Sequence, residues 1–225
     1  MFTGIITNIG EIVNLKPSNH GLELIFATDF TAKDVKLGDS VAINGACSTI
    51  TKINGKTYHV DLSEETLSRT YFKELKIKDK LNLELSLTPN SRLGGHFVSG
   101  HVDEVGVIRE LSYDHDFAKL SILFGPSYRN LLIEKGSITI DGISLTIAHI
   151  YDSYFECAII PYTVEHTTLK FKANKNSEKK VNLEYDLLGK YIVNYVSNIS
   201  NSNLSQQKTN DVNLLTALTK SGFIK

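Results

Sequence analysis

The sequence predicts a mainly β protein in which two similar antiparallel modules stand in tandem and are followed by a C-terminal α-helix. Three observations support this prediction. The chain repeats itself at long range, its strand candidates alternate apolar and polar residues with a period of two, and tight-turn dipeptides lie between them. Many short strands joined by regular turns are typical of a small antiparallel barrel or sandwich. The length of 225 residues suits two domains.

The internal repeat is clearest when residues 39–51 are laid over residues 136–148, a shift of 97 positions. Five of the 13 aligned pairs are identical, and Cys47 is matched by the near-isosteric Ser144. Further matches follow in the same order: Thr66 with Thr163, Thr70 with Thr167, and residues 80–84 with residues 180–184. Three blocks in one order indicate duplication rather than a chance similarity of β-rich sequence.

The duplication sets the expected domain boundaries. The first module covers residues 1–96, and the second covers residues 97–193 and includes the start of the C-terminal helix. Residues 194–225 then hold the end of that helix, a polar linker rich in Ser, Asn and Gln, and a tail.

Short-range patterns place strands and turns within the modules. Period-two alternation over Val41–Ile43, Tyr58–Leu62 and Leu81–Leu85 predicts half-buried strands. Tight hairpin turns are expected where a residue that tolerates positive φ precedes glycine: Asn44-Gly45, Asn54-Gly55 and Asp141-Gly142. In the second module Pro126 is expected to open a short helix, with Gly136 just beyond its end.

The C-terminal helix is predicted from an apolar stripe at helical spacing. Asp186 is a suitable N-cap. The stripe consists of Leu187, Leu188, Tyr191, Ile192, Tyr195, Val196 and Ile199. Because both modules are complete before it, the stripe packs either on its own module or against another subunit, and the sequence leaves both arrangements open.

Composition and charge exclude several classes of function. The chain has 24 basic and 25 acidic residues, so it offers no electrostatic attraction to nucleic acid or to an anionic membrane, and neither is expected as a partner. No apolar run approaches the roughly 18 residues of a membrane span, and the N-terminus has no signal-peptide pattern. The two cysteines, Cys47 and Cys157, do not make a disulfide scaffold, and we therefore expect a cytoplasmic protein.

The usual catalytic motifs are missing, including the phosphate-binding loop, the dinucleotide fingerprint and the nucleophile elbow. His96 and His101 lie close in sequence, but a five-residue separation along a strand puts the two imidazoles on opposite faces, so no metal site is expected. Small polar residues do recur at repeated positions: Cys47, Ser48 and Thr49 against Ser144 and Thr146, and Thr66 against Thr163. Taken singly these are ordinary strand residues, but their duplication favours two similar pockets for a polar heterocycle.

Five blocks of the sequence carry a resemblance to a known family. They are residues 1–6 (MFTGII), 44–49 (NGACST), 94–103 (GGHFVSGHVD), 135–146 (KGSITIDGISLT) and 160–168 (IPYTVEHTT). In order and spacing they resemble the signature blocks of riboflavin synthase of the alpha-chain type. The resemblance implies two six-stranded antiparallel Greek-key barrels in tandem, with a C-terminal α-helix that holds a homotrimer.

The same resemblance implies a reaction. Two molecules of 6,7-dimethyl-8-ribityllumazine exchange a four-carbon unit and give riboflavin and 5-amino-6-ribitylaminouracil, the final step of riboflavin biosynthesis, without a metal or organic cofactor. In the family the active site lies between the first barrel of one subunit and the second barrel of a neighbour. An association with lumazine synthase is left open. The alternative is an antenna-type protein that binds a lumazine or flavin without turnover.

The resemblance also assigns site residues by position. The first pocket corresponds to Gly4, Ile5, Ile6, Cys47, Ser48, Thr49, Asp61, Leu62, Ser63, Glu64, Glu65 and Thr66. The second corresponds to Gly100, His101, Val102, Ser144, Leu145, Thr146, Ile159, Ile160, Pro161, Tyr162, Thr163 and Val164, with Lys135 reaching in from an adjacent subunit.

Three of these residues are expected to be catalytic. Ser144 and His101 would move protons at the donor, and Cys47 would act at the acceptor ring, either as a nucleophile or by positioning a water molecule. Ser48 and Tyr162 depart from the family pattern beside pocket residues, which predicts an altered substrate affinity.

Overall fold

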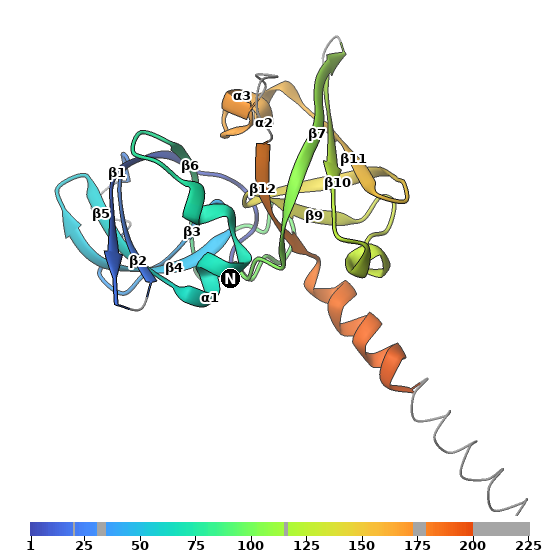
Figure 1. The fold of residues 1–225 in the computed structure, drawn as a ribbon, viewed down its shortest axis with the longest axis horizontal. Coiled ribbons are helices and arrows are strands. Elements are labelled where there is room, and N and C mark those ends of the chain that lie inside the picture. The colour runs from blue at the N-terminus through green and yellow to red at the C-terminus, as the bar shows by residue number, and fades with distance from the viewer. Residues whose placement is uncertain (20, 31–34, 115–116, 173–178, 200–225) are drawn as a thin grey trace, which may run out of the picture. The chain divides into compact units, whose positions relative to one another are not determined.

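The computed structural model describes residues 1–19, 21–30, 35–114, 117–172 and 179–199. Within them the chain forms two closed, six-stranded antiparallel barrels followed by a helix, which confirms the predicted fold class (Figure 1). The first barrel is coloured blue to teal and the second green to orange. No helix of the described part is both long and apolar enough to cross a membrane.

The two barrels share one strand order. The first is built from β1 (Asn8–Ser18), β2 (Gly21–Ala27), β3 (Ser40–Ile43), β4 (Ala46–Asn54), β5 (Thr57–Ser63) and β6 (Lys80–Leu85). The second is built from β7 (Glu104–Asp114), β8 (Phe117–Leu123), β9 (Ser137–Ile140), β10 (Ile143–Ile150), β11 (Tyr154–Ile159) and β12 (Lys179–Tyr185). Around the first barrel the order is β1-β2-β5-β4-β3-β6, and the second repeats it as β7-β8-β11-β10-β9-β12. The duplication seen in the sequence is therefore a duplication of topology.

Two of the predicted tight turns occupy equivalent places, between β3 and β4 and between β9 and β10. Asn44 and Gly45 adopt φ values of 42° and 83°, and Asp141 and Gly142 adopt 47° and 80°. Positive φ at both central residues is what a two-residue hairpin turn matched to the strand twist requires. Both predictions are confirmed.

Short helices connect the strands. They are α1 (Glu64–Arg69), η1 (Tyr71–Glu74), η2 (Pro126–Leu131), α2 (Pro161–Glu165) and α3 (Leu169–Lys172). Pro126 opens a helix as predicted, but this 3₁₀ helix ends at Leu131, well before Gly136. At the third predicted turn β4 continues through Asn54, and only Gly55 of that pair has a positive φ, of 61°.

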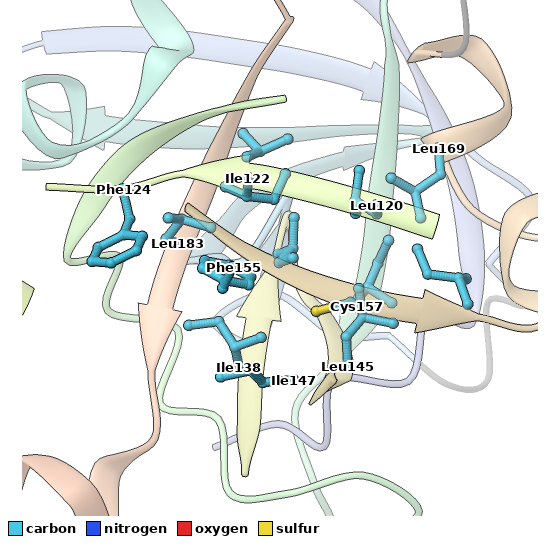
Figure 2. Close-up of a cluster of buried hydrophobic side chains, with 14 of the residues drawn as sticks. Leu120, Ile122, Phe124, Ile138, Leu145, Ile147, Phe155, Cys157, Leu169 and Leu183 are labelled. Carbon is cyan, nitrogen blue, oxygen red and sulfur yellow. The ribbon is translucent and has the colours of Figure 1, made fainter. Parts of the chain in front are cut away.

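Each barrel encloses its own apolar core. In the first, the predicted strands are present, and Val60, Leu81 and Leu83 are completely buried. The prediction of half-burial is wrong for the last strand, because Asn82 and Glu84 on its other face are buried by their contacts with the second barrel and with residues 3 and 4. The second core is drawn in Figure 2, where Phe155 lies among the side chains of neighbouring strands. The thiol of Cys157 belongs to this core, and burial raises its pKa.

A symmetric set of hydrogen bonds joins the two barrels. The side-chain N–H of Asn82 donates to the carbonyl of Asp141 at 2.9 Å, and that of Asn182 donates to the carbonyl of Asn44 at 2.9 Å. The side-chain oxygen of each asparagine accepts a backbone N–H from the helical connection of the opposite barrel. The repeated asparagine therefore links each barrel to the turn and the helical connection of the other.

The C-terminal helix covers residues 187–199 of the described chain and begins directly after Asp186, which confirms the predicted helix. Its apolar stripe is exposed in the single chain: Tyr191, Ile192 and Tyr195 are 69%, 62% and 67% exposed. Residues 200–225, which hold the predicted polar linker and tail, lie outside the described residues.

Candidate active site

A buried glutamate holds the segment that leads into each module, here called the leading segments (residues 2–6 and 98–102). Glu84 accepts the backbone N–H and the hydroxyl of Thr3 at 2.7 and 2.6 Å and the following N–H at 2.9 Å. Glu184 accepts the same three bonds from the second segment, at 2.7, 2.7 and 2.9 Å. Burial raises the pKa of Glu84, and the hydrogen bonds from Thr3 oppose that shift. The repeated glutamate therefore fixes the course of each leading segment.

Each leading segment also bonds to the barrel of the other module. The carbonyl of Gly4 accepts the backbone N–H of Ser144 at 2.7 Å, and the carbonyl of Gly100 accepts that of Cys47 at 2.8 Å. The two glycines have φ values of 77° and 82°. A Cβ added to Gly4 would lie 2.6 Å from the Cβ of Ser144, and one added to Gly100 would lie 2.6 Å from the Cβ of Cys47. Only glycine fits at either position.

This exchange corrects the expected grouping of the two pockets. The resemblance grouped residues 4–6 with Cys47 and residues 100–102 with Ser144. In the structure Gly4 bonds to Ser144 and Ile6 packs against the second core, whereas Gly100 bonds to Cys47. Each pocket therefore combines one barrel with the leading segment of the other module.

A cavity of about 220 Å³ opens beside Cys47. Its lining consists of Ala46, Cys47, Glu65, Thr66, Arg69, Thr70, Gly100, His101 and Val102. Six of the predicted site residues thus meet at one place: Cys47, Glu65, Thr66, Gly100, His101 and Val102. Ser144 does not line this cavity, so His101 lies with Cys47 and not with its expected partner.

Ser144 is instead hydrogen-bonded to His96, which the sequence pattern does not single out as a site residue. Its Oγ lies 2.7 Å from Nδ1 of His96, and Nε2 of the same ring lies 3.2 Å from Oγ1 of Thr139. Thr139 and Ser144 are cross-strand partners on β9 and β10, so their side chains lie on one face of the sheet. Burial lowers the pKa of His96, and the negative charge of Asp186 opposes this shift. The imidazole is therefore neutral at neutral pH.

Strand alternation separates the predicted site residues into those facing outward and those facing a core. In β4, Cys47 and Thr49 face outward, while Ser48 is 6% exposed and faces the barrel interior. Leu145 is the corresponding interior residue of β10. Three further predicted site residues also belong to the cores: Leu62, Ile159 and Val164. The Oγ of Ser48 has no hydrogen-bond partner among the described residues, so this departure from the family pattern affects the core and not a side chain of the pocket.

Short helices flank the two positions in equivalent ways. Helix α1 carries Glu65 and Arg69, which form an exposed ion pair at 3.0 Å. Helix α2 has Tyr162 and His166 at the corresponding positions, and their rings stack with centroids 3.9 Å apart. The second module thus has an aromatic stack where the first has an ion pair. The neighbouring predicted residues Asp61, Ser63, Glu64, Ile160 and Pro161 are exposed.

Lys135 lies in the turn before β9, where it is exposed and has a φ of 66°. Its backbone N–H donates to the carbonyl of Ile147 at 2.8 Å. It does not line the cavity beside Cys47, and its approach from a neighbouring subunit stays a prediction. A larger, more open groove of about 890 Å³ passes Ile5 and Glu84 and touches neither Cys47 nor Ser144. Within the described ranges, no group of three or more His, Cys, Asp or Glu is placed to hold a metal ion.

Comparison with known proteins identifies relatives along most of the chain. The family described as the lumazine binding domain matches twice, at residues 3–86 and 99–186. The riboflavin synthase of Actinobacillus pleuropneumoniae is 42% identical over 197 residues, which cover 87% of this chain and 90% of that protein. The riboflavin synthase of Photobacterium leiognathi is 39% identical over 225 residues, the full length of both. That of Bacillus subtilis is 37% identical over 207 residues, or 92% of this chain and 94% of the relative.

Solved structures agree with the fold. The structure of LumP in complex with 6,7-dimethyl-8-(1'-D-ribityl) lumazine has a TM-score of 0.72 and 22% identity, and covers 82% of this chain and 99% of LumP. The complex of LumP with riboflavin has a TM-score of 0.74 and 23% identity, with the same coverage. At this low sequence identity, the two structures support a shared fold and nothing further. With two matched lumazine binding domains and relatives near 40% identity over most or all of its length, the chain belongs to the riboflavin synthase family.

Proposed function

We propose that this protein is a riboflavin synthase. It transfers a four-carbon unit between two molecules of 6,7-dimethyl-8-ribityllumazine and releases riboflavin and 5-amino-6-ribitylaminouracil, which makes it a transferase. The observation that carries the proposal is the duplicated site. Cys47 and Ser144 stand at equivalent positions of the two barrels, each against a glycine of a leading segment. Two like pockets suit a reaction whose donor and acceptor are the same compound.

The chemistry places modest demands on the protein. The C7 methyl of the lumazine is acidic because the ring delocalises the carbanion that forms when a proton leaves. The protein must therefore hold two rings in register and move protons between them. Holding both reactants makes the bond-forming step effectively intramolecular, which is worth about 7–11 kcal/mol of barrier in favourable cases. A positioned proton-transfer group contributes roughly a further 10²–10⁴-fold.

Ser144 is the proposed proton acceptor at the donor pocket, and its hydroxyl is already engaged by the neutral imidazole of His96. Cys47 is proposed to act at the acceptor pocket, as a nucleophile at C7 or as the group that positions a water molecule. His101 lines the same cavity as Cys47, which supports a role at the acceptor pocket.

The remaining predicted residues are proposed to bind the ring and the ribityl chain. Thr49, Thr66, Thr146 and Thr163 are neither core residues nor fully buried, so their hydroxyls are available to a ligand. Ser48, Leu62, Leu145, Ile159 and Val164 can offer only backbone groups, because their side chains fill the barrels. A few fixed polar groups in a largely apolar wall are typical of a site for a polar heterocycle.

We propose that the active unit is a homotrimer in which the Cys47 pocket of one subunit faces the Ser144 pocket of the next. The cavity beside Cys47 contains no residue of β10 or α2, which supports a second ring supplied by another subunit. The exposed apolar stripe of the C-terminal helix supports a contact between subunits. Both cysteines are free thiols, which suits the cytosol as the place of action. Association with lumazine synthase stays a prediction of the family resemblance.

An antenna-type protein that binds a lumazine without turnover is the alternative. Two observations favour the enzyme. The relatives at 37–42% identity are named riboflavin synthase, and the second pocket keeps Ser144 with a hydrogen-bonded histidine. A binding protein needs no proton-transfer group in that pocket.

The test is to incubate the purified protein with 6,7-dimethyl-8-ribityllumazine alone and to follow riboflavin by chromatography. The expected result is one riboflavin for every two lumazine molecules consumed, without added metal or cofactor. Tight lumazine binding without riboflavin would move the protein to the antenna class. Neither binding nor turnover would contradict both functions.

A further inference from the structure

The two pockets differ in the side chains that cover the cross-strand pair to which Ser144 or Cys47 belongs. In the second barrel Thr139 and Ser144 are partners on β9 and β10, and both hydroxyls contact the ring of His96. In the first barrel the equivalent partners are Ala42 and Cys47. Duplication of the fold has therefore produced one pocket with a chain of three polar side chains and one without it.

An apolar cluster takes the place of that chain in the first barrel. Ala42 packs with Phe2 and Val98, and Cys47 packs against the same cluster. Phe2 and Val98 belong to the two leading segments and pair with each other through two backbone hydrogen bonds at 2.8 and 3.1 Å. His101 and Glu65 line the cavity beside Cys47, but among the described residues neither is hydrogen-bonded to its thiol, so the two pockets differ in how the reacting side chain is connected to a base.

Three hydrogen bonds of His96 and the close packing of Gly95 hold this segment over Ser144. The backbone N–H of His96 donates to the carbonyl of Thr3 at 3.1 Å, and the two ring nitrogens contact the hydroxyls of Ser144 and Thr139. The preceding residue, Gly95, packs so closely that an added Cβ would lie 2.9 Å from the Oγ of Ser144. The backbone of the segment that carries His96 is therefore held directly against Ser144.

The surroundings of His96 favour the neutral ring. The neighbours that contact it are the Thr3 carbonyl and the hydroxyls of Ser144 and Thr139, and the charged group acting on it is Asp186. Burial lowers the pKa of His96, and the charge of Asp186 works against this shift. When Nε2–H donates to Thr139, Nδ1 is left free to accept the hydroxyl proton of Ser144.

We infer that His96 is a positioning residue of the donor pocket that acts through Ser144. Its ring is the terminal acceptor, because it takes up the proton that Ser144 passes on, and Thr139 fixes the tautomer of that ring. This inference rests on the proposed function. When the Ser144 oxygen takes a proton from the C7 methyl of the bound lumazine, the hydroxyl proton of Ser144 passes to Nδ1 of His96. The products are a lumazine carbanion and an imidazolium cation, and Ser144 is neutral before and after. The proton returns by the reverse path when the donor fragment leaves.

The assignment also fixes which pocket is the donor. Only the Ser144 pocket has a base connected to its hydroxyl within the described chain, so the lumazine bound there loses its methyl proton. The lumazine beside Cys47 is then the acceptor.

The test compares His96→Gln, His96→Ala and Thr139→Val with the full-length wild type, using lumazine as the only substrate. His96→Gln can still bond to Ser144 but does not titrate. We expect kcat to fall roughly 10²–10⁴-fold in both His96 variants, with the lumazine Kd within about threefold. The acid limb of the wild-type kcat profile, set by the lowered pKa of His96, disappears in His96→Gln. Thr139→Val should lower kcat by about tenfold, because the ring then loses the partner of Nε2. His149→Gln, an exposed histidine near Glu134, is the matched control and should behave like the wild type.

Two further measurements separate this role from a structural one. Exchange of the C7 methyl protons of bound lumazine in D₂O reports the first proton transfer alone, and it should slow in both His96 variants. Ser144→Ala combined with His96→Ala should be no slower than Ser144→Ala by itself, because His96 acts through Ser144. Wild-type kcat and methyl exchange in His96→Gln, or additive losses in the double variant, would overturn the inference. Failure of the wild type to form riboflavin would instead overturn the proposed function, and the methyl exchange would still test His96.

Discussion

Asn82 in the first barrel donates its side-chain N–H to the carbonyl of Asp141 in the second barrel at 2.9 Å. Its side-chain oxygen accepts the backbone N–H of Thr168 at 2.7 Å, and the residue is completely buried. One side chain therefore hydrogen-bonds to backbone groups of both a hairpin turn and a helical connection in the opposite barrel. Because the leading segments cross between the barrels, this connection also keeps both pockets assembled.

Replacing Asn82 by Ala is expected to lower the free energy of unfolding by about 3 kcal/mol. Two buried partners lose their hydrogen bonds, and each unsatisfied group costs roughly 1–3 kcal/mol. Urea denaturation at a fixed protein concentration measures the change. Asn90→Ala is the control, because Asn90 is exposed and its loss should change stability by less than about 0.5 kcal/mol. Equal stability of the two variants would show that Asn82 is not needed between the barrels.

The fold could be predicted largely because its signals are local or repeated. Alternation marked the strands around Val60 and Leu83, and the glycine dipeptides marked two turns with the correct backbone geometry. The repeated Asn82 and Glu84 were visible in the alignment of the two copies, but their roles were not. Both bond to residues far away in the sequence, and a pattern along one strand carries no information about such partners.

Cys47→Ala is expected to reduce kcat at least a hundredfold while lumazine binding changes by less than about threefold. The reason is that the thiol is proposed to act on the acceptor ring, whereas the cavity beside it has eight other lining residues that hold the ligand. Steady-state riboflavin formation and fluorescence titration of lumazine measure the two effects. Cys157→Ala is the matched control: it removes a completely buried thiol from the second core and should lower stability but not kcat per folded molecule. Full turnover in Cys47→Ala would remove Cys47 from the mechanism.

The site was predicted less completely than the fold, for reasons that particular residues make plain. Position in the repeat identified Cys47 and Ser144 correctly as equivalent, but it could not tell to which barrel Gly4 and Gly100 cross. His96 precedes the aligned blocks of the second copy, so the repeat gave no signal for its contact with Ser144. Alternation along β4 does predict which side chains face the barrel interior, and by that rule Ser48 belongs to the core.

Ser48→Ala is expected to raise the free energy of unfolding by about 1 kcal/mol. Its Oγ is buried without a hydrogen-bond partner among the described residues, and such a group costs roughly 1–3 kcal/mol. Part of that gain is offset by the packing lost with the oxygen atom. Thermal and urea unfolding measure the change, and kcat should stay at the wild-type value because the side chain faces the core. A destabilised variant would mean that the hydroxyl is satisfied in solution.

Lys172→Met is expected to destabilise the protein by about 3–5 kcal/mol, because it leaves a buried carboxylate without its partner. Lys172 Nζ lies 2.6 Å from Oδ2 of Asp141, and their side chains are 15% and 0% exposed. Burial raises the pKa of Asp141, and the charge of Lys172 opposes the shift.

In Lys172→Met the folded-state pKa of Asp141 is therefore higher still, because the opposing charge is lost. The loss of stability should be smaller at pH 5 than at pH 8, because a raised folded-state pKa removes stability as the pH rises. Denaturation at the two pH values measures this difference. Lys16→Met, which breaks an exposed pair with Glu23 at 3.2 Å and leaves Glu23 its contact with His59, should cost less than about 1 kcal/mol at both. A pH-independent loss in Lys172→Met would contradict the assignment.

The apolar stripe of the C-terminal helix is expected to hold the subunits together. Tyr191 and Tyr195 are more than two-thirds exposed in the single chain, and a stripe of this size on a helix surface is typical of an interface. Replacing both by Asp should shift the protein from the proposed trimer to a monomer in sedimentation, since the charges would have to be buried between subunits. Asn194→Asp with Ser197→Asp places the same two charges on the polar side of the helix and should leave the trimer intact. Because the proposed active site is shared between subunits, the monomer should also lose riboflavin formation. The activity of the Asp variant should then depend on protein concentration, whereas that of the control should not. A fully active monomer would place both lumazine molecules within one chain and would contradict the proposed shared site.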